Sequence, residues 1–208
     1  VANLWLAGKL PYIHAVEVRP PANYLPFMFV QYFWGDSELG IRILDLVLIY
    51  FSSVLVFLIG KNGISRRVGF ISAILFPIFY YGYFNFWYSC QMEGWQNFFI
   101  LCEIFLYLKN SKYLFSAFDF LAGFCFGISI LFKFTSLPIV FLFLILILVR
   151  NRDKQSTALG KILNGVYFCL GFFVPVFITI LYFYSKEALS FLKEVLYEFV
   201  ILGYSKEK

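Results

Sequence analysis

The chain of 208 residues has little charge and a single histidine, His14. Charged residues make up 14% of it, whereas hydrophobic residues make up 62% and aromatic residues 23%. The few remaining polar residues are not enough to cover a water-soluble surface. This scarcity excludes a soluble globular protein and predicts a polytopic membrane protein whose main partner is the lipid bilayer.

Several familiar catalytic motifs are missing. The sequence has no Walker-type phosphate loop, no paired cysteine or cysteine–histidine spacing for a metal, and no G-x-S-x-G. It also lacks a soluble domain of the kind that nucleotide-sugar enzymes carry. Four cysteines lie inside or at the ends of apolar runs, which favours small packing side chains over disulfides: Cys90, Cys102, Cys125 and Cys169.

Apolar segments predict the fold class, because a membrane-spanning helix needs about 20 residues. We predict an all-α transmembrane bundle with six spans, the fifth one short, at residues 41–60, 68–87, 88–108, 113–132, 134–149 and 162–184. Residues 1–37 are predicted to form an external loop. Within that loop, residues 22–34 are too short to span and are interrupted by Pro26, so they should lie along the interface. Residues 185–203 predict a second, amphipathic interfacial helix, which begins another external loop over residues 185–208.

The chain has a net charge of +5, and its basic residues gather in alternate loops between these spans, at residues 61–67, 109–112 and 150–161. Lysine and arginine concentrate in cytoplasmic loops of membrane proteins. The pattern therefore indicates membrane topology rather than nucleic-acid binding, and it places residues 8–24 on the opposite, external face.

Two pairs of residues within the predicted spans have an expected structural role. Arg42 and Asp45 are one helical turn apart and can pair at the outer end of the first span. Gly123 and Gly127 have the G-x-x-x-G spacing that lets two helix backbones approach closely. We expect this glycine pair to serve packing within the chain.

Residues 8–24, G-K-L-P-Y-I-H-A-V-E-V-R-P-P-A-N-Y, form a polar, proline-rich stretch in an otherwise apolar chain. Gln91, Glu93 and Lys133 are predicted at the same membrane face. Two interpretations stay open for each. Lys133 could meet a phosphate or extend its amine to the surface, and Gln91 and Glu93 could line a site or face water. The stretch itself could simply begin an interfacial helix, with a weak surface ion pair between Glu17 and Arg19.

The stretch, followed by G-D-S-E-L-G-I-R-I-L, Q-M-E and L-A-G-F-C-F-G-I-S-I-L-F-K, resembles bacterial membrane glycosyltransferases related to protein O-mannosyltransferases and aminoarabinose transferase. These enzymes share the GT-C fold, and the four motifs cover nearly the whole chain in order. The resemblance implies transfer of a sugar from a polyprenyl-phosphate carrier to a lipid, glycan or protein acceptor, outside the bacterial inner membrane.

The resemblance also implies residue roles. Arg19 stands where the family usually has lysine, so it and Lys133 are the expected donor-phosphate ligands. His14 stands at a common aspartate position, and Glu17 is an auxiliary acid. The expected lining residues are Tyr12, His14, Pro20, Pro21, Tyr24, Gln91 and Glu93. The family's catalytic aspartate is expected upstream of Val1, so the chain should be an inactive N-terminal-half fragment of the enzyme.

No cofactor is required by these motifs, although a divalent metal stays open. A transporter or polymerase subunit for lipid-linked sugars, or a non-catalytic homologue, is the alternative function. Charges deep within several spans would favour transport, whereas an acidic motif upstream would favour transfer.

Overall fold

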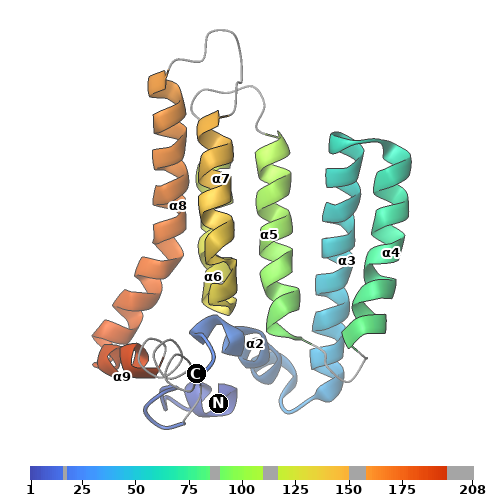
Figure 1. Ribbon diagram of the computed structural model, residues 1–208. Coiled ribbons are helices and arrows are strands. Elements are labelled where there is room, and N and C mark those ends of the chain that lie inside the picture. The colour runs from blue at the N-terminus through green and yellow to red at the C-terminus, as the bar shows by residue number, and fades with distance from the viewer. Residues whose placement is uncertain (16–17, 85–89, 110–116, 150–157, 196–208) are drawn as a thin grey trace, which may run out of the picture.

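A computed structural model of the protein describes residues 1–15, 18–84, 90–109, 117–149 and 158–195. All the regular secondary structure in these ranges is helical, so the predicted all-α class is confirmed. Long helices run side by side, and short ones lie across the lower end in the view of Figure 1. The long helices are α3 (Glu38–Gly63), α4 (Arg66–Phe84), α5 (Met92–Lys109), α6 (Ala117–Phe132), α7 (Leu137–Val149) and α8 (Ala158–Ser185).

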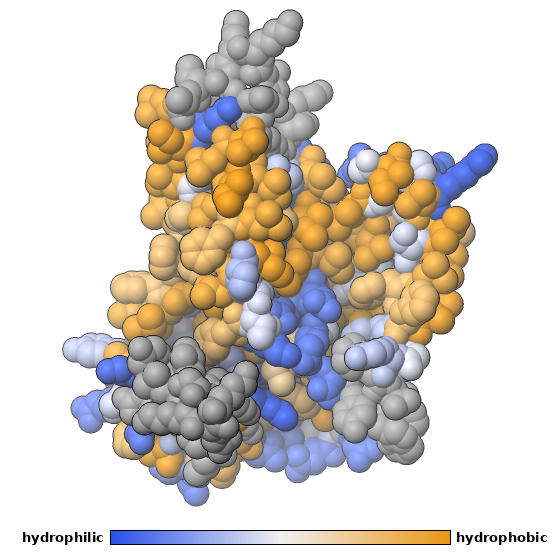
Figure 2. Space-filling model, viewed as in Figure 1, coloured by the Kyte–Doolittle hydropathy of each residue, from blue (hydrophilic) through white to orange (hydrophobic). Residues whose placement is uncertain are grey.

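The outer surface of the bundle is suited to lipid. Helix α3 and residues Leu159–Ser185 of α8 are long and apolar enough to cross a membrane, and α6 and α7 are shorter apolar helices. Large apolar side chains are exposed along the helix flanks, among them Ile78, Phe141 and Phe177, each at least 59% exposed. Figure 2 shows these hydrophobic flanks and the hydrophilic residues gathered at the lower end. The molecule is a membrane helical bundle, as predicted.

The short helices all lie at the lower end of the bundle. They are α1 (Ala2–Leu6), η1 (Pro21–Tyr24), α2 (Leu25–Trp34), η2 (Phe134–Ser136) and α9 (Leu189–Lys193). A buried cluster ties the N-terminal segment to the end of α8 and to α9 through Tyr12, Tyr24, Phe183, Ala188 and Leu192. The N-terminal segment is therefore packed as part of the fold.

The structure adds detail to several predicted boundaries. Within residues 1–37, α2 falls inside the predicted interfacial segment 22–34, and the short helices α1 and η1 precede it. Pro26 does not interrupt that helix, because it stands in the first turn of α2, where its missing N–H costs nothing. The third predicted basic loop was too long, since α8 already begins at Ala158.

Helices α6 and α8 pack backbone to backbone through glycine, as expected for Gly123 and Gly127. A side chain at Gly123 would overlap the carbonyl oxygen of Phe168, and one at Gly171 would overlap that of Phe120. The adjoining core contains buried residues of α6, α7 and α8: Ala122, Phe126, Ile130, Val140, Phe143, Ile147 and Phe168. This contact lies within one chain, so the packing interpretation of the G-x-x-x-G spacing is confirmed.

Candidate functional site

The segment from Pro20 to Tyr24 is fastened to the lower end of α6 by Asn23. Pro20 has an extended backbone and Pro21 begins η1, which turns the Asn23 side chain inward. Its amide nitrogen donates to the carbonyl oxygen of Phe132 at 2.8 Å and to that of Pro20 at 3.1 Å. Asn23 is buried and spans 109 positions of sequence to reach Phe132. The stretch that carries Arg19 is thereby placed beside Lys133, the residue that follows α6.

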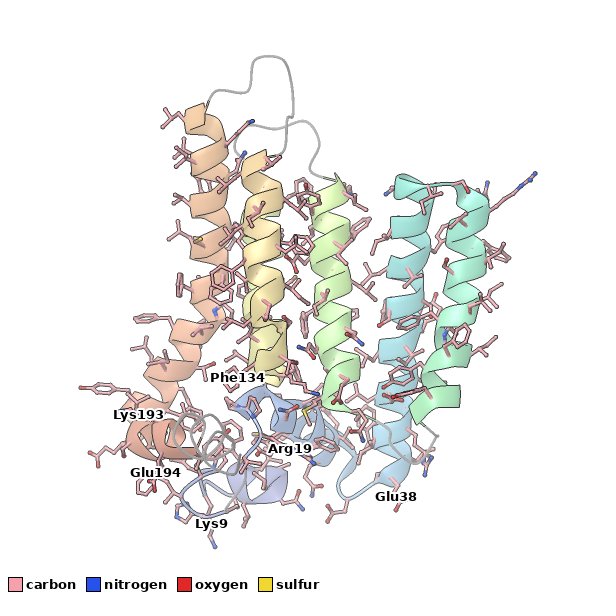
Figure 3. The ribbon with its side chains drawn as sticks, in the orientation of Figure 1. Lys9, Arg19, Glu38, Phe134, Lys193 and Glu194 are labelled. Carbon is pink, nitrogen blue, oxygen red and sulfur yellow. The ribbon has the colours of Figure 1, made fainter. Side chains whose placement is uncertain are left out.

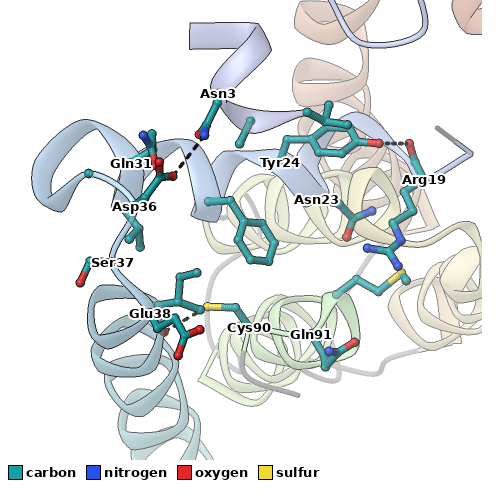
Figure 4. A pocket seen from close by; sticks show the side chains of 17 residues that line it. Asn3, Arg19, Asn23, Tyr24, Gln31, Asp36, Ser37, Glu38, Cys90 and Gln91 are labelled. Atoms are coloured by element: carbon teal, nitrogen blue, oxygen red, sulfur yellow. Dashed lines mark hydrogen bonds between the residues drawn. The ribbon is translucent and has the colours of Figure 1, made fainter. Parts of the chain in front are cut away.

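Two tyrosines hold the backbone of Arg19. The hydroxyl of Tyr12 donates to the Arg19 carbonyl oxygen at 2.6 Å, and the hydroxyl of Tyr24 lies 3.4 Å from the same atom. Both tyrosines are buried. With the backbone fixed, the guanidinium group of Arg19 lies between Asn23 and Gln91 in Figure 4.

Arg19 faces a cavity of about 510 Å³ at the lower end of the bundle. One wall comes from α1, η1 and α2, and the other from the start of α3 and the residues before α5. Figure 3 shows Arg19 and Glu38 at this same end. The lining residues are Val1, Ala2, Asn3, Arg19, Asn23, Tyr24, Phe27, Val30, Gln31, Gly35, Asp36, Ser37, Glu38, Ile41, Cys90, Gln91 and Met92.

The wall away from Arg19 is acidic. Asp36 and Glu38 line the cavity there, and the side-chain nitrogen of Asn3 donates to Asp36 Oδ1 at 3.1 Å. The side-chain amide of Gln31 lies within hydrogen-bond distance of both Asn3 and Asp36. Ser37 fixes the start of α3, because its hydroxyl accepts a hydrogen bond from the backbone of Gly40 at 3.1 Å. The cavity thus offers a cation on one side and carboxylates on the other (Figure 4).

Lys133 and Glu93 form an ion pair beside the cavity. The distance from Lys133 Nζ to Glu93 Oε1 is 2.8 Å, and the two side chains are 34% and 29% exposed. Gln96 and Ser136 both donate to the carbonyl oxygen of Lys133 at 3.1 Å. The charge of Arg19 also acts on Glu93 electrostatically. Glu93 therefore lies within the influence of two cations.

Asp45 positions the chain before α5. Its carboxylate accepts hydrogen bonds from the backbone N–H of Cys90 at 3.0 Å and from the hydroxyls of Tyr80 and Tyr81 at 3.3 and 3.2 Å. Its side chain is almost fully buried. These contacts come from α4 and from the residues preceding α5, whereas the sequence indicated Arg42, one turn away on the same helix. They fix the backbone of Cys90 and with it the cavity wall.

The structure brings some of the predicted site residues to the cavity and places others beside it or away from it. Arg19, Tyr24 and Gln91 line the cavity, and Glu93 and Lys133 pair beside it. Tyr12, Pro20 and Pro21 are buried as support, and His14 is exposed with Nδ1 at 3.3 Å from the Leu10 carbonyl oxygen. Glu17 lies outside the described residues. Sequence reasoning missed the polar lining residues Asn3, Asn23, Gln31, Asp36 and Glu38, although G-D-S-E and P-P-A-N-Y both marked polar groups beside apolar helices.

No group of three or more His, Cys, Asp or Glu side chains suited to a metal occurs among the residues that the structure describes. The protein is thus an integral membrane protein with a polar cavity at one end of a helical bundle. A cation lines one side of this cavity, and carboxylates line the other. Residues 18–179 match the family described as dolichyl-phosphate-mannose-protein mannosyltransferase.

The match spans most of the chain, so the chain belongs to this family of membrane glycosyltransferases that use a lipid-linked sugar donor. No curated protein and no solved structure matches it. The family assignment agrees with the resemblance drawn from the sequence motifs.

Proposed function

We propose that the protein transfers a sugar from a polyprenyl-phosphate carrier to an acceptor at the cavity, on the external face of a bacterial inner membrane. The observation that carries this proposal is the placement of Arg19, whose side chain enters the cavity beside the Lys133–Glu93 pair. A guanidinium group can bind phosphate oxygens through two parallel hydrogen bonds. Arg19, Lys133 and Glu93 together carry a charge of +1, which matches the single negative charge of a sugar phosphodiester.

In the transfer step, the bond between the anomeric carbon and the carrier phosphate oxygen breaks. A bond forms from that carbon to the acceptor oxygen, and the carrier phosphate leaves with the electron pair. Its new negative charge is stabilised by Arg19 and by Lys133. The acceptor proton passes to a carboxylate. Asp36 and Glu38 face the cavity from the wall opposite Arg19, so we assign the acceptor to that side.

A second hollow, of about 340 Å³, lies on the other side of η1 and suits the hydrocarbon of the carrier. Its lining is almost entirely apolar: Trp5, Pro21, Ala22, Leu25, Met28, Leu131, Ile178, Thr179, Tyr182 and Phe183. Residues of η1 and α2 alternate between the linings of the two hollows, so these two helices separate a polar chamber from an apolar one. A lipid phosphate held at Arg19 has apolar surface nearby for its chain.

The distribution of charge supports the proposed orientation of the site. Lys61, Arg66 and Arg67 surround the turn between α3 and α4, at the upper end of the bundle in Figure 1. Basic turns face the cytoplasm in most membrane proteins. The cavity, at the opposite end, then opens to the external face.

The test is Arg19→Ala in the full-length protein, assayed for binding of a radiolabelled polyprenyl-phosphate mannose and for sugar transfer. Removing a bidentate charged contact should weaken binding by about tenfold to a hundredfold, with membrane insertion unchanged. Lys9→Ala is the matched control, because it removes one exposed positive charge at the same end without touching the cavity. Normal binding and turnover by Arg19→Ala would remove Arg19 from the site.

A further inference from the structure

A third hollow, of about 760 Å³, lies between α3 and α4, and it shares no lining residue with the candidate site. Two arginines and otherwise mostly apolar side chains line it. They are Tyr50, Ser53, Val54, Phe57, Arg66, Arg67, Phe70, Ala73 and Ile74. The arginines begin α4, so the hollow is a groove with a basic end at the α3–α4 turn. It is named the α3–α4 groove below.

The geometry of the groove follows from two glycines. A side chain at Gly60 would lie 2.6 Å from the Cα atom of Gly69, which shows how closely α3 and α4 approach near their turn. Phe57 and Phe70, each close in sequence to one of these glycines, flank the contact and form part of the groove. The close contact holds the two helices together, and the large side chains beside it leave a depression on one face.

The apolar part of the groove is open to the surroundings of the bundle. Tyr50 is 65% exposed, Phe70 60% and Ile74 48%. Helix α4 stands at the edge of the bundle in Figure 1, next to α3. Contiguous exposed apolar surface of this kind marks a binding site or a membrane contact. On the outer surface of a membrane bundle, lipid acyl chains are the apolar material that contacts such a groove.

The basic end of the groove has no acidic partner within the described part of the chain, since no ion pair forms there with Arg66 or Arg67. Both side chains are exposed. They also stand at the first positions of a 19-residue helix, where the helix dipole adds partial positive charge. Figure 2 shows hydrophilic groups at this upper end of the hairpin above hydrophobic flanks.

We propose that the α3–α4 groove binds one anionic glycerophospholipid, with an acyl chain along Phe57, Phe70 and Ile74 and the headgroup phosphate at Arg66 and Arg67. Basic pockets between membrane helices recognise anionic headgroups in this way. A free phosphate lacks the chain that fills the apolar part, and a zwitterionic lipid lacks the net charge that the two arginines favour. The inference is independent of the proposed transferase reaction.

The experiment is native mass spectrometry of the detergent-purified protein, titrated with phosphatidylglycerol, with phosphatidylcholine of the same chains, and with glycerol phosphate. We expect one tightly retained phosphatidylglycerol, weaker phosphatidylcholine and no retained glycerol phosphate. The double variant Arg66→Gln with Arg67→Gln should weaken phosphatidylglycerol binding by roughly tenfold to thirtyfold. Each basic residue near an anionic lipid contributes electrostatic attraction, and this variant loses two of them.

Two matched controls separate a site from general attraction. Lys61→Gln with Lys109→Gln removes the same charge at the same end of the bundle without touching the groove, and should leave phosphatidylglycerol binding intact. Ala73→Phe fills the groove, whereas Ile71→Phe adds bulk at an exposed position of α4 outside its lining. Only Ala73→Phe should lower binding.

The proposal is overturned if both charge pairs weaken binding equally, which indicates non-specific attraction. It is also overturned if phosphatidylcholine binds as tightly as phosphatidylglycerol, or if Ala73→Phe binds lipid normally. Absence of any retained phospholipid would mean that something other than lipid covers the groove.

Discussion

Asn23 offers a sharp test of how the fold positions Arg19. In Asn23→Leu, a side chain of similar size replaces the amide, and both of its donated hydrogen bonds are lost. The Phe132 carbonyl oxygen loses its 2.8 Å bond from Asn23, at a cost of about 1–3 kcal/mol for a buried group. The Pro20 carbonyl oxygen keeps a bond from the Asn23 backbone at 3.2 Å, so its loss is about 1 kcal/mol.

The total, roughly 2–4 kcal/mol, corresponds to a fall of roughly 4–16 °C in apparent Tm for a chain of this size. Sugar transfer should fall by about tenfold to a hundredfold, because a displacement near 1 Å at a binding group has effects of that order. The Tm is measured on detergent-purified protein, and transfer is measured with polyprenyl-phosphate mannose. The control is Asn97→Leu, the same chemical change at an exposed position of α5.

The two readouts distinguish structure from function. A lower Tm with normal turnover by the folded protein would show that Asn23 stabilises the fold without positioning Arg19. An unchanged Tm would contradict the hydrogen-bond argument itself. A matching loss in Asn97→Leu would mean that the effect comes from added apolar surface and not from the Asn23 contacts.

Two further predictions concern packing and topology. Gly171→Leu should force α6 and α8 apart, because the new side chain overlaps the Phe120 carbonyl oxygen, and the yield of folded protein should fall. Gly82→Leu, at a position with open space around it, should leave that yield unchanged. In a cysteine-free background, a membrane-impermeant maleimide applied to intact cells should label Lys9→Cys and leave Asn62→Cys unlabelled until the cells are broken. Equal labelling of the two would refute the proposed orientation of the cavity.

The helices themselves could be predicted from the sequence because a membrane leaves the backbone few choices. Every buried N–H and C=O must find a partner within its own segment, so a long apolar run becomes a helix. Gly123 and Gly127 were likewise recognisable, since their spacing places both on one helix face. The ends were harder: α3 extends to Glu38 because the Ser37 hydroxyl caps it, beyond the apolar run that begins at Ile41.

The contacts that build the site could not be read from local patterns. Asp45 has Arg42 one turn away, yet its carboxylate is satisfied by Tyr80, Tyr81 and the backbone of Cys90, which lie 35 to 45 positions further along the chain. Glu103 has Lys109 six positions further along α5. It is nevertheless fully buried, and its carboxylate oxygens make no hydrogen bond with the described residues. Such partners depend on which helices become neighbours, which spacing along one helix does not encode.

The location of the polar groups also bears on the alternative of transport. A transporter needs a polar path that reaches the middle of the membrane from either side. The cavity is instead lined from the short helices, the start of α3 and the residues before α5, all at one end of the bundle. Above it, a packed core that includes Phe126, Phe143 and Phe168 fills the space between α6, α7 and α8. The buried acids Glu103 and Asp119 do not line the cavity. An arrangement open at one end suits an enzyme that takes donor and acceptor from the same side, and it favours transfer over transport.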